Sequence, residues 1–135
     1  MRPKSPTLTA NELELMKIVW AHADGVTVRA IYEQLRTRRP IAYTTVMTSM
    51  KTLEQKGYLK ASQQDRAFVY KPSQPKHKVI RAMVREFVDR VFNGSSRPLV
   101  VHLLEDDQIS ERDLQEIARM TGEARDNAHV TRKRQ

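Results

Sequence analysis

The chain has 135 residues, enough for one domain or for one small domain with an extension. It contains no cysteine, which excludes disulfides, thiol catalysis and cysteine metal sites. No apolar run approaches the roughly 20 residues of a membrane span, and the start of the chain lacks the apolar stretch of a signal peptide. We therefore expect no membrane insertion and a cytoplasmic location.

Positive charge is concentrated in the first half of the chain. The formal net charge is +8. Residues 1–72 hold 12 Lys and Arg against 6 Asp and Glu, whereas residues 73–135 hold 12 against 10. A polyanionic partner is therefore expected to contact the first half.

Two short helices are predicted first. Thr9 and Glu12 have the spacing of a capping box, in which each side chain accepts a hydrogen bond from an open backbone N–H at a helix start. The turn Asp24-Gly25 ends this helix. Residues 26–28 predict a short strand, and Thr27 is also a candidate cap for a second helix that ends near residue 37.

A third helix, over residues 42–55, has two unlike faces. The inward face is apolar with spacing i, i+4 and i+7, and consists of Val46, Met50 and Leu53. The opposite face offers hydroxyls, an amide and one ammonium, with no carboxylate to repel phosphate; it consists of Thr44, Thr48, Lys51 and Gln55. Gly57 supplies the left-handed residue that ends the helix.

The third helix is followed by a predicted hairpin. Residues 58–62 and 67–71 read as strands around the polar turn 63–66. A helix followed by such a wing is typical of a winged helix-turn-helix that binds double-stranded DNA. The candidate DNA contacts are Tyr43, Thr44, Thr45, Met47, Thr48, Lys51, Arg66 and Arg38.

These candidates have different expected roles. Threonine hydroxyls bond base edges and their methyl groups pack on thymine, whereas the Tyr43 hydroxyl is placed to reach a phosphate. Met47 is equally compatible with a base contact and with completing the core. Arg66, at the wing tip, suits a contact with the DNA backbone or minor groove, and Arg38 belongs to a basic turn that suits phosphate; solvated arginines are the alternative for both.

The second half is predicted to contain three helices with more apolar surface than one monomer buries. The helix over residues 74–92 has seven apolar residues on one face, the next begins near Pro98, and Ser110 with Asp113 starts the last. We expect a homodimer. Its candidate contacts are Ile80, Met83, Val84, Phe87, Val88, Val91, Leu99, Val100, Leu103 and Leu104.

The predicted fold is mainly α with a small β wing (α+β), divided into four segments. They are a flexible basic arm (1–8), a winged helix-turn-helix DNA-binding domain (9–72), a helical dimerisation domain (73–121) and a disordered tail (122–135).

Several motifs resemble the BlaI/MecI family, the penicillinase and methicillin-resistance repressors. Residues 41–48 with 56–59 resemble that family's recognition helix, and residues 65–70 resemble its wing. The first helix, from Leu8 to Trp20, and the apolar run that begins at Leu99 also match. The resemblance extends over about residues 7–120.

This resemblance implies a dimeric winged-helix repressor on a pseudo-palindromic operator. It also implies a membrane-bound sensor metallopeptidase that detects β-lactam and causes cleavage of the repressor at an Asn-Phe bond. That bond corresponds to His102-Leu103 here, and neither residue matches. A copper-sensing branch of the family uses paired cysteines, which this chain lacks.

Enzyme activity is not expected. The four histidines lack metal-ligand spacing, and the chain has no phosphate-binding glycine loop or nucleophile elbow, so we expect neither a metal nor a cofactor. Two alternatives stay open: a winged-helix regulator released by a small ligand, and a module that binds protein or RNA.

Overall fold

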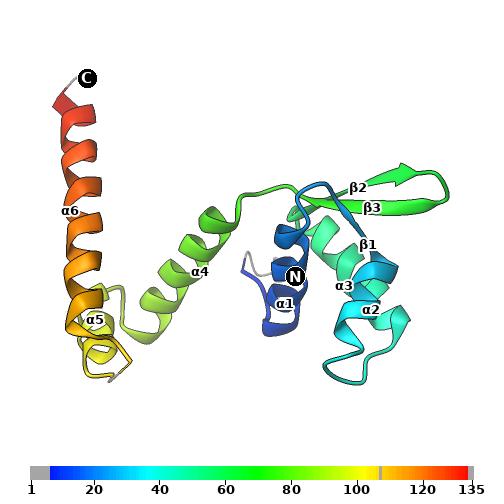
Figure 1. The fold of residues 1–135 in the computed structure, drawn as a ribbon, viewed down its shortest axis with the longest axis horizontal. Coiled ribbons are helices and arrows are strands. Elements are labelled where there is room, and N and C mark those ends of the chain that lie inside the picture. The colour runs from blue at the N-terminus through cyan, green and yellow to red at the C-terminus, as the bar shows by residue number, and fades with distance from the viewer. Residues whose placement is uncertain (1–6, 107, 134–135) are drawn as a thin grey trace. The chain divides into compact units, whose positions relative to one another are not determined.

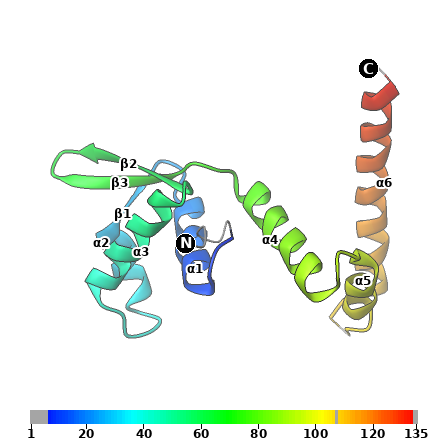
Figure 2. The same ribbon diagram turned by 180° about the vertical axis from the view of Figure 1, so that it is seen from behind.

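The computed structural model describes residues 7–106 and 108–133, with side chains up to residue 123. It consists of two compact units, one ending at Phe87 and one beginning at Val88. The described elements confirm the predicted α+β class (Figures 1 and 2). In chain order they are α1 (Ala10–Ala21), β1 (Val26–Thr27), α2 (Val28–Leu35), α3 (Tyr43–Gln55), β2 (Leu59–Gln64), β3 (Ala67–Pro72), α4 (Lys76–Val91), α5 (Ser96–Leu104) and α6 (Glu111–Lys133).

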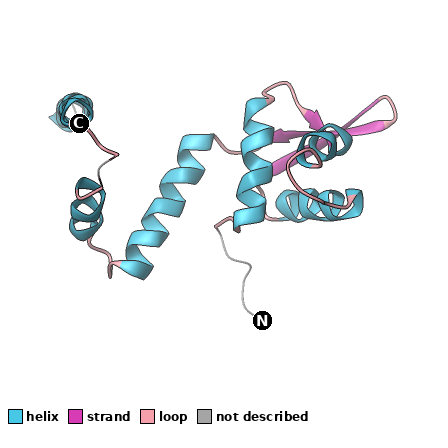
Figure 3. Cartoon of the chain, turned by 60° about the horizontal axis from the view of Figure 1, so that its bottom comes forward, coloured by secondary structure: helices cyan, strands magenta, loops and turns pink. Residues whose placement is uncertain are grey.

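The three strands form an antiparallel sheet in the order β1-β3-β2 (Figure 3). β1 pairs with β3 through Val26 and Tyr70. β2 and β3 form the wing, whose last pair, Gln64 and Ala67, leaves a two-residue turn. This turn is shorter than the predicted 63–66, because Asp65 adopts a φ of 55° and reverses the chain tightly.

The core of the first unit lies between the sheet and the three helices α1, α2 and α3. The inward face predicted for α3 is confirmed, because Val46, Met50 and Leu53 are fully buried. Leu8 also lies in this core, although we expected the flexible arm to extend through residue 8. The Leu8 side chain is apolar and is therefore buried, whereas polar residues of a flexible arm stay solvated. Residues 1–6 of that arm lie outside the described residues.

Local signals at the helix ends are confirmed. The Thr9 N–H donates to Glu12 Oε1 at 2.8 Å, and the Glu12 N–H donates to Thr9 Oγ1 at 3.2 Å, which is the predicted capping box. Thr27 both ends β1 and caps α2, since its hydroxyl accepts from the Ala30 N–H. Gly57, with a φ of 88°, ends α3 as predicted.

Part of the apolar stripe of α4 packs inside the first unit. Val79 is buried in its core, and Met83 packs against that core. Val88 is only 2% exposed within its own chain. Val79 and Met83 of α4 therefore belong to the core of the first unit, although the sequence analysis placed this helix in the dimerisation region. The chain leaves β3 at Pro72 and starts α4 only four residues later, so the first turns of α4 lie against the winged core.

The last helix begins as predicted, because Ser110 Oγ accepts from the Asp113 N–H and Asp113 Oδ2 accepts from the Ser110 N–H. It continues to Lys133, whereas we expected a disordered tail from residue 122. The tail is polar, yet it has no proline and contains good helix formers, so polarity alone did not decide its conformation. No helix in the described ranges is long and apolar enough to cross a membrane.

Candidate nucleic-acid interface

The outer face of α3 is exposed along its length. Thr44, Thr45, Thr48 and Lys51 are all exposed, as the amphipathic pattern requires. The three threonines and Ser49 line one shallow hollow, so hydroxyl groups dominate this part of the surface. Met47 is 45% exposed, which places it on the surface rather than in the core. This face can donate and accept hydrogen bonds without a charge that repels DNA.

A groove runs beside this face, between the start of α2, α3 and the wing. Its lining includes three cations, one from each element, against one carboxylate, that of Glu54. The cations are Arg29 from α2, Lys51 from α3 and Arg66 from the wing. Much of the remaining lining is apolar and includes Met47, Phe68 and Tyr70.

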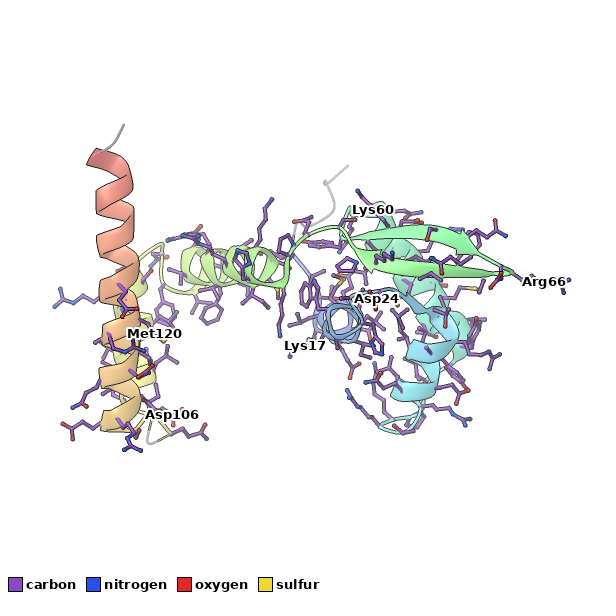
Figure 4. All side chains as sticks on the ribbon, turned by 45° about the horizontal axis from the view of Figure 1, so that its top comes forward. Lys17, Asp24, Lys60, Arg66, Asp106 and Met120 are labelled. Carbon is purple, nitrogen blue, oxygen red and sulfur yellow. The ribbon has the colours of Figure 1, made fainter. Side chains whose placement is uncertain are left out.

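Arg66 occupies the end of the wing. Figure 4 shows its side chain at the tip of the hairpin, pointing away from the helices of the first unit. The two-residue turn presents Arg66 directly after Asp65. The side chain is exposed, as a wing-tip contact with DNA requires.

The basic turn after α2 holds three arginines with different surroundings. Arg39 Nη2 lies 2.6 Å from Glu14 Oε1 and also donates to Asn11 Oδ1 at 2.9 Å, so it ties this turn to α1. Arg36 Nε lies 2.8 Å from Glu33 Oε2. Arg38 is exposed and makes no ion pair with any described residue, which leaves its charge available.

Tyr43, the first residue of α3, is held by two residues of α2. The Tyr32 ring meets it edge-on, with centroids 5.5 Å apart and an interplanar angle of 79°. The Arg29 guanidinium carbon lies 5.4 Å from the Tyr43 centroid, at cation–π distance. Sequence reasoning did not single out Arg29, because its approach to Tyr43 depends on how α2 packs against α3.

A buried ion pair fixes the other end of α3. Lys56 Nζ lies 2.9 Å from Glu12 Oε1, and the two side chains are 11% and 8% exposed. Burial raises the pKa of Glu12, but hydrogen bonds from the Thr9 N–H and from Lys56 outweigh burial and hold the pKa below its usual value. This pair joins the first turn of α1 to the C-terminal end of α3, and so helps position the exposed face.

The second unit carries exposed apolar side chains rather than an obvious polar site. Eight of them lie on α4, α5 and α6 from Val91 onward, and Leu99 beside them is half-buried; the eight are Val91, Val100, Val101, Leu103, Leu104, Leu114, Ile117 and Met120. Val84 and Phe87 are also exposed on α4. His102 and Leu103 lie within α5 and are both exposed. Within the described residues, no three His, Asp or Glu side chains gather in a way that would hold a metal ion.

Comparison with known proteins identifies relatives of nearly the whole chain. Residues 8–123 match the family model described as penicillinase repressor. The chain is 28% identical over 132 residues to the penicillinase repressor of Bacillus licheniformis, covering 98% of each. It is 33% identical over 95 residues to the transcriptional regulator BlaI of Mycobacterium tuberculosis, covering 70% of this chain and 69% of BlaI. It is 21% identical to the methicillin resistance regulatory protein MecI of Mammaliicoccus sciuri, covering 87% and 94%.

Proposed function

Because this chain belongs to the penicillinase repressor family, which includes BlaI and MecI, we propose that it is a sequence-specific DNA-binding transcriptional repressor. The observation that carries this proposal is the exposed, carboxylate-free face of α3 with the basic wing beside it. The proposed site of action is the cytoplasm.

In this proposal α3 enters the major groove and the wing lies against the neighbouring backbone. Thr44, Thr48 and Lys51 read base edges, because hydroxyls and an ammonium complement the acceptors exposed there. Arg38 and Arg66 bind phosphates, which position the protein without reading sequence. Thr45 and Met47 flank the recognition face, where Met47 can pack on a thymine methyl group.

We further propose that the repressor acts as a homodimer on a pseudo-palindromic operator. The exposed apolar side chains of α5 and α6 support this, since a second copy is the partner whose matching surface would cover them. Two copies of α3 would then meet half-sites one helical turn, or a multiple of it, apart.

Release of the operator is proposed to require cleavage of the repressor in response to a membrane-bound sensor metallopeptidase. The bond His102-Leu103 is the candidate cleavage position, and both residues are exposed. The bond lies inside α5, so this segment would have to leave its helical conformation to enter a peptidase site as an extended chain.

Selection from a random duplex library, followed by fluorescence anisotropy, tests the central proposal. The selected duplex should bind at least about 1,000-fold more tightly than a scrambled duplex of the same composition. The logarithm of affinity should fall linearly with the logarithm of salt concentration, because bound phosphates release counterions. Equal binding to both duplexes at moderate salt would contradict operator recognition and favour a general polyanion-binding module.

A further inference from the structure

We propose that Arg29 binds a DNA phosphate and that the Tyr43 ring holds the Arg29 guanidinium in position for this contact. This inference rests on the proposed function and changes the role expected of Tyr43, which was a direct phosphate contact through its hydroxyl. Arg29 is thereby a further contact residue, and Tyr43 a positioning residue.

The Tyr43 ring is held in place by neighbouring aromatic packing. Tyr32, from the middle of α2, meets the ring nearly at right angles, with an interplanar angle of 79° and centroids 5.5 Å apart. Edge-to-face pairs of this kind are attractive. Tyr43 as a residue remains 36% exposed, so it is accessible to another group at the surface. A fixed and partly exposed ring is a suitable platform for a cation.

Arg29 makes use of that platform. Its guanidinium carbon lies 5.4 Å from the Tyr43 centroid. A guanidinium over a ring keeps its N–H donors directed outward, and its planar fork matches two oxygens of a phosphate. The Arg29 side chain is 71% exposed, so these donors face solvent on the surface of the first unit. This position over the ring therefore limits the motion of Arg29 without consuming its hydrogen bonds.

The carboxylate nearest to Arg29 is shared with another arginine. Glu33 Oε1 lies 3.6 Å from Arg29 Nη1, whereas Glu33 Oε2 lies 2.8 Å from Arg36 Nε. Arg36 is therefore the closer partner. An exposed ion pair at the longer distance stabilises Arg29 little, so a phosphate can displace it.

The groove determines which phosphate Arg29 is placed to bind. Arg29 and Tyr43 line the same groove as Lys51 of α3 and Arg66 of the wing. The two arginines, from α2 and the wing, suit the phosphates of a single sugar–phosphate strand, and the apolar part of the lining suits its deoxyribose, while Lys51 and the one carboxylate, Glu54, belong to α3. Arg29 thus holds the strand on the α2 side, opposite the contact proposed for Arg66.

Binding measurements with paired variants test the proposal. Arg29→Met should weaken binding to the selected and the scrambled duplex alike, by about tenfold, and should lower the magnitude of the salt slope by about 0.9. The matched control is Lys17→Met, which removes the same charge from an exposed position on α1 (Figure 4). It should retain affinity within about twofold of wild type, since Lys17 lies outside the groove.

The role of Tyr43 is tested by separating its ring from its hydroxyl. Tyr43→Phe should bind within about twofold of wild type, because the ring remains. Tyr43→Leu should weaken binding, but by less than Arg29→Met does. The double variant Arg29→Met/Tyr43→Leu should bind no more weakly than Arg29→Met alone. Arg29→Lys, which keeps the charge without the fork, should fall between wild type and Arg29→Met.

Distinct results would overturn the proposal. Equal affinities of Arg29→Met and Lys17→Met would exclude a local contact, and a changed base preference in Arg29→Met would make it a base contact. An equal loss in Tyr43→Phe and Tyr43→Leu would return the phosphate contact to the hydroxyl. If the wild type itself does not prefer its selected duplex, the proposed function fails as well. Thermal unfolding of each variant verifies that it is folded. If Tyr43→Leu does not fold, the affinities of Arg29→Met and Tyr43→Phe still test the proposal.

Discussion

At the outer face of α3, Lys51 combines an exposed side chain with a position in the groove beside the wing. Its ammonium can donate to acceptors on guanine in the major groove. We predict that Lys51→Ala weakens binding to the selected duplex by about 1–3 kcal/mol and changes base preference at one position. Anisotropy titrations against a set of single-base variants measure both effects. An equal loss on every duplex would assign Lys51 to a phosphate.

The Glu12–Lys56 pair predicts a specific response to acid. The pKa of Glu12 is lowered in the folded state, so the folded protein favours the ionised carboxylate. This stabilisation is complete above the ordinary pKa of 4.5 and is lost as the pH falls through the folded-state pKa. As the pH falls below 4.5, the free energy of unfolding should therefore decrease less in Glu12→Gln than in wild type. Urea denaturation at several pH values measures this difference.

At neutral pH the same variant should be less stable than wild type by about 1–3 kcal/mol, because Lys56 keeps a buried charge without its partner. Glu33→Gln is the control, since Glu33 is exposed and should change stability by less than about 0.5 kcal/mol. If both variants respond equally to acid, the buried pair does not contribute in the way described.

Among the elements, the turn from α1 to β1 depends on a glycine. Gly25 has a φ of 110°, and a Cβ at this position would lie 2.3 Å from Val69 Cγ1 on β3. Val69 is β-branched and moves little in response. Gly25→Ala should destabilise the first unit by about 2–4 kcal/mol, from backbone strain and overlap together. Denaturant unfolding measures this loss.

Gly57→Ala is the matched comparison for that substitution. Gly57 also has a positive φ, of 88°, but a Cβ there would meet no described atom within 4 Å. Only backbone strain remains, so the expected loss is about 1 kcal/mol. Equal losses in the two variants would show that contact with Val69 does not matter.

Elements with local signals were predictable from the sequence. The caps at Thr9 and Ser110 and the glycine after α3 act within a few residues, and all three are confirmed. The packing of Val79 and Met83 against the first unit was not predictable, since it depends on where α4 lies after the wing. Periodicity identified an apolar stripe on α4 but not which side chains of that helix pack against the first unit.

The same distinction holds within the candidate site. Exposure of the α3 face follows from the burial of Val46, Met50 and Leu53, so helix periodicity was sufficient. The contact of Arg29 with Tyr43 joins two helices, and that of Arg39 with Glu14 joins the turn after α2 to α1. Spacing along the chain does not contain this information.

At the scale of the whole molecule, the exposed apolar surface of α5 and α6 predicts self-association. Ile117 is 51% exposed, and its burial between two copies should stabilise a dimer by about 1.5–3 kcal/mol. Ile117→Asp should therefore raise the dimer dissociation constant by about 100-fold in sedimentation equilibrium. Gln115→Asp adds the same charge at an exposed polar position of α6 and should have little effect. A wild-type monomer at micromolar concentration would contradict the homodimer.

Sequence readout by the outer face of α3 is the central property of the proposed repressor, and one comparison measures it directly. The ratio of affinities for the selected and scrambled duplexes should be determined for wild type and for the variant Thr44→Ala/Thr48→Ala/Lys51→Ala. We predict that this affinity ratio is much smaller in the variant than in wild type. Its affinity for the scrambled duplex should fall only by the amount expected from removing the Lys51 charge. An unchanged ratio in the folded variant would show that another surface reads the DNA.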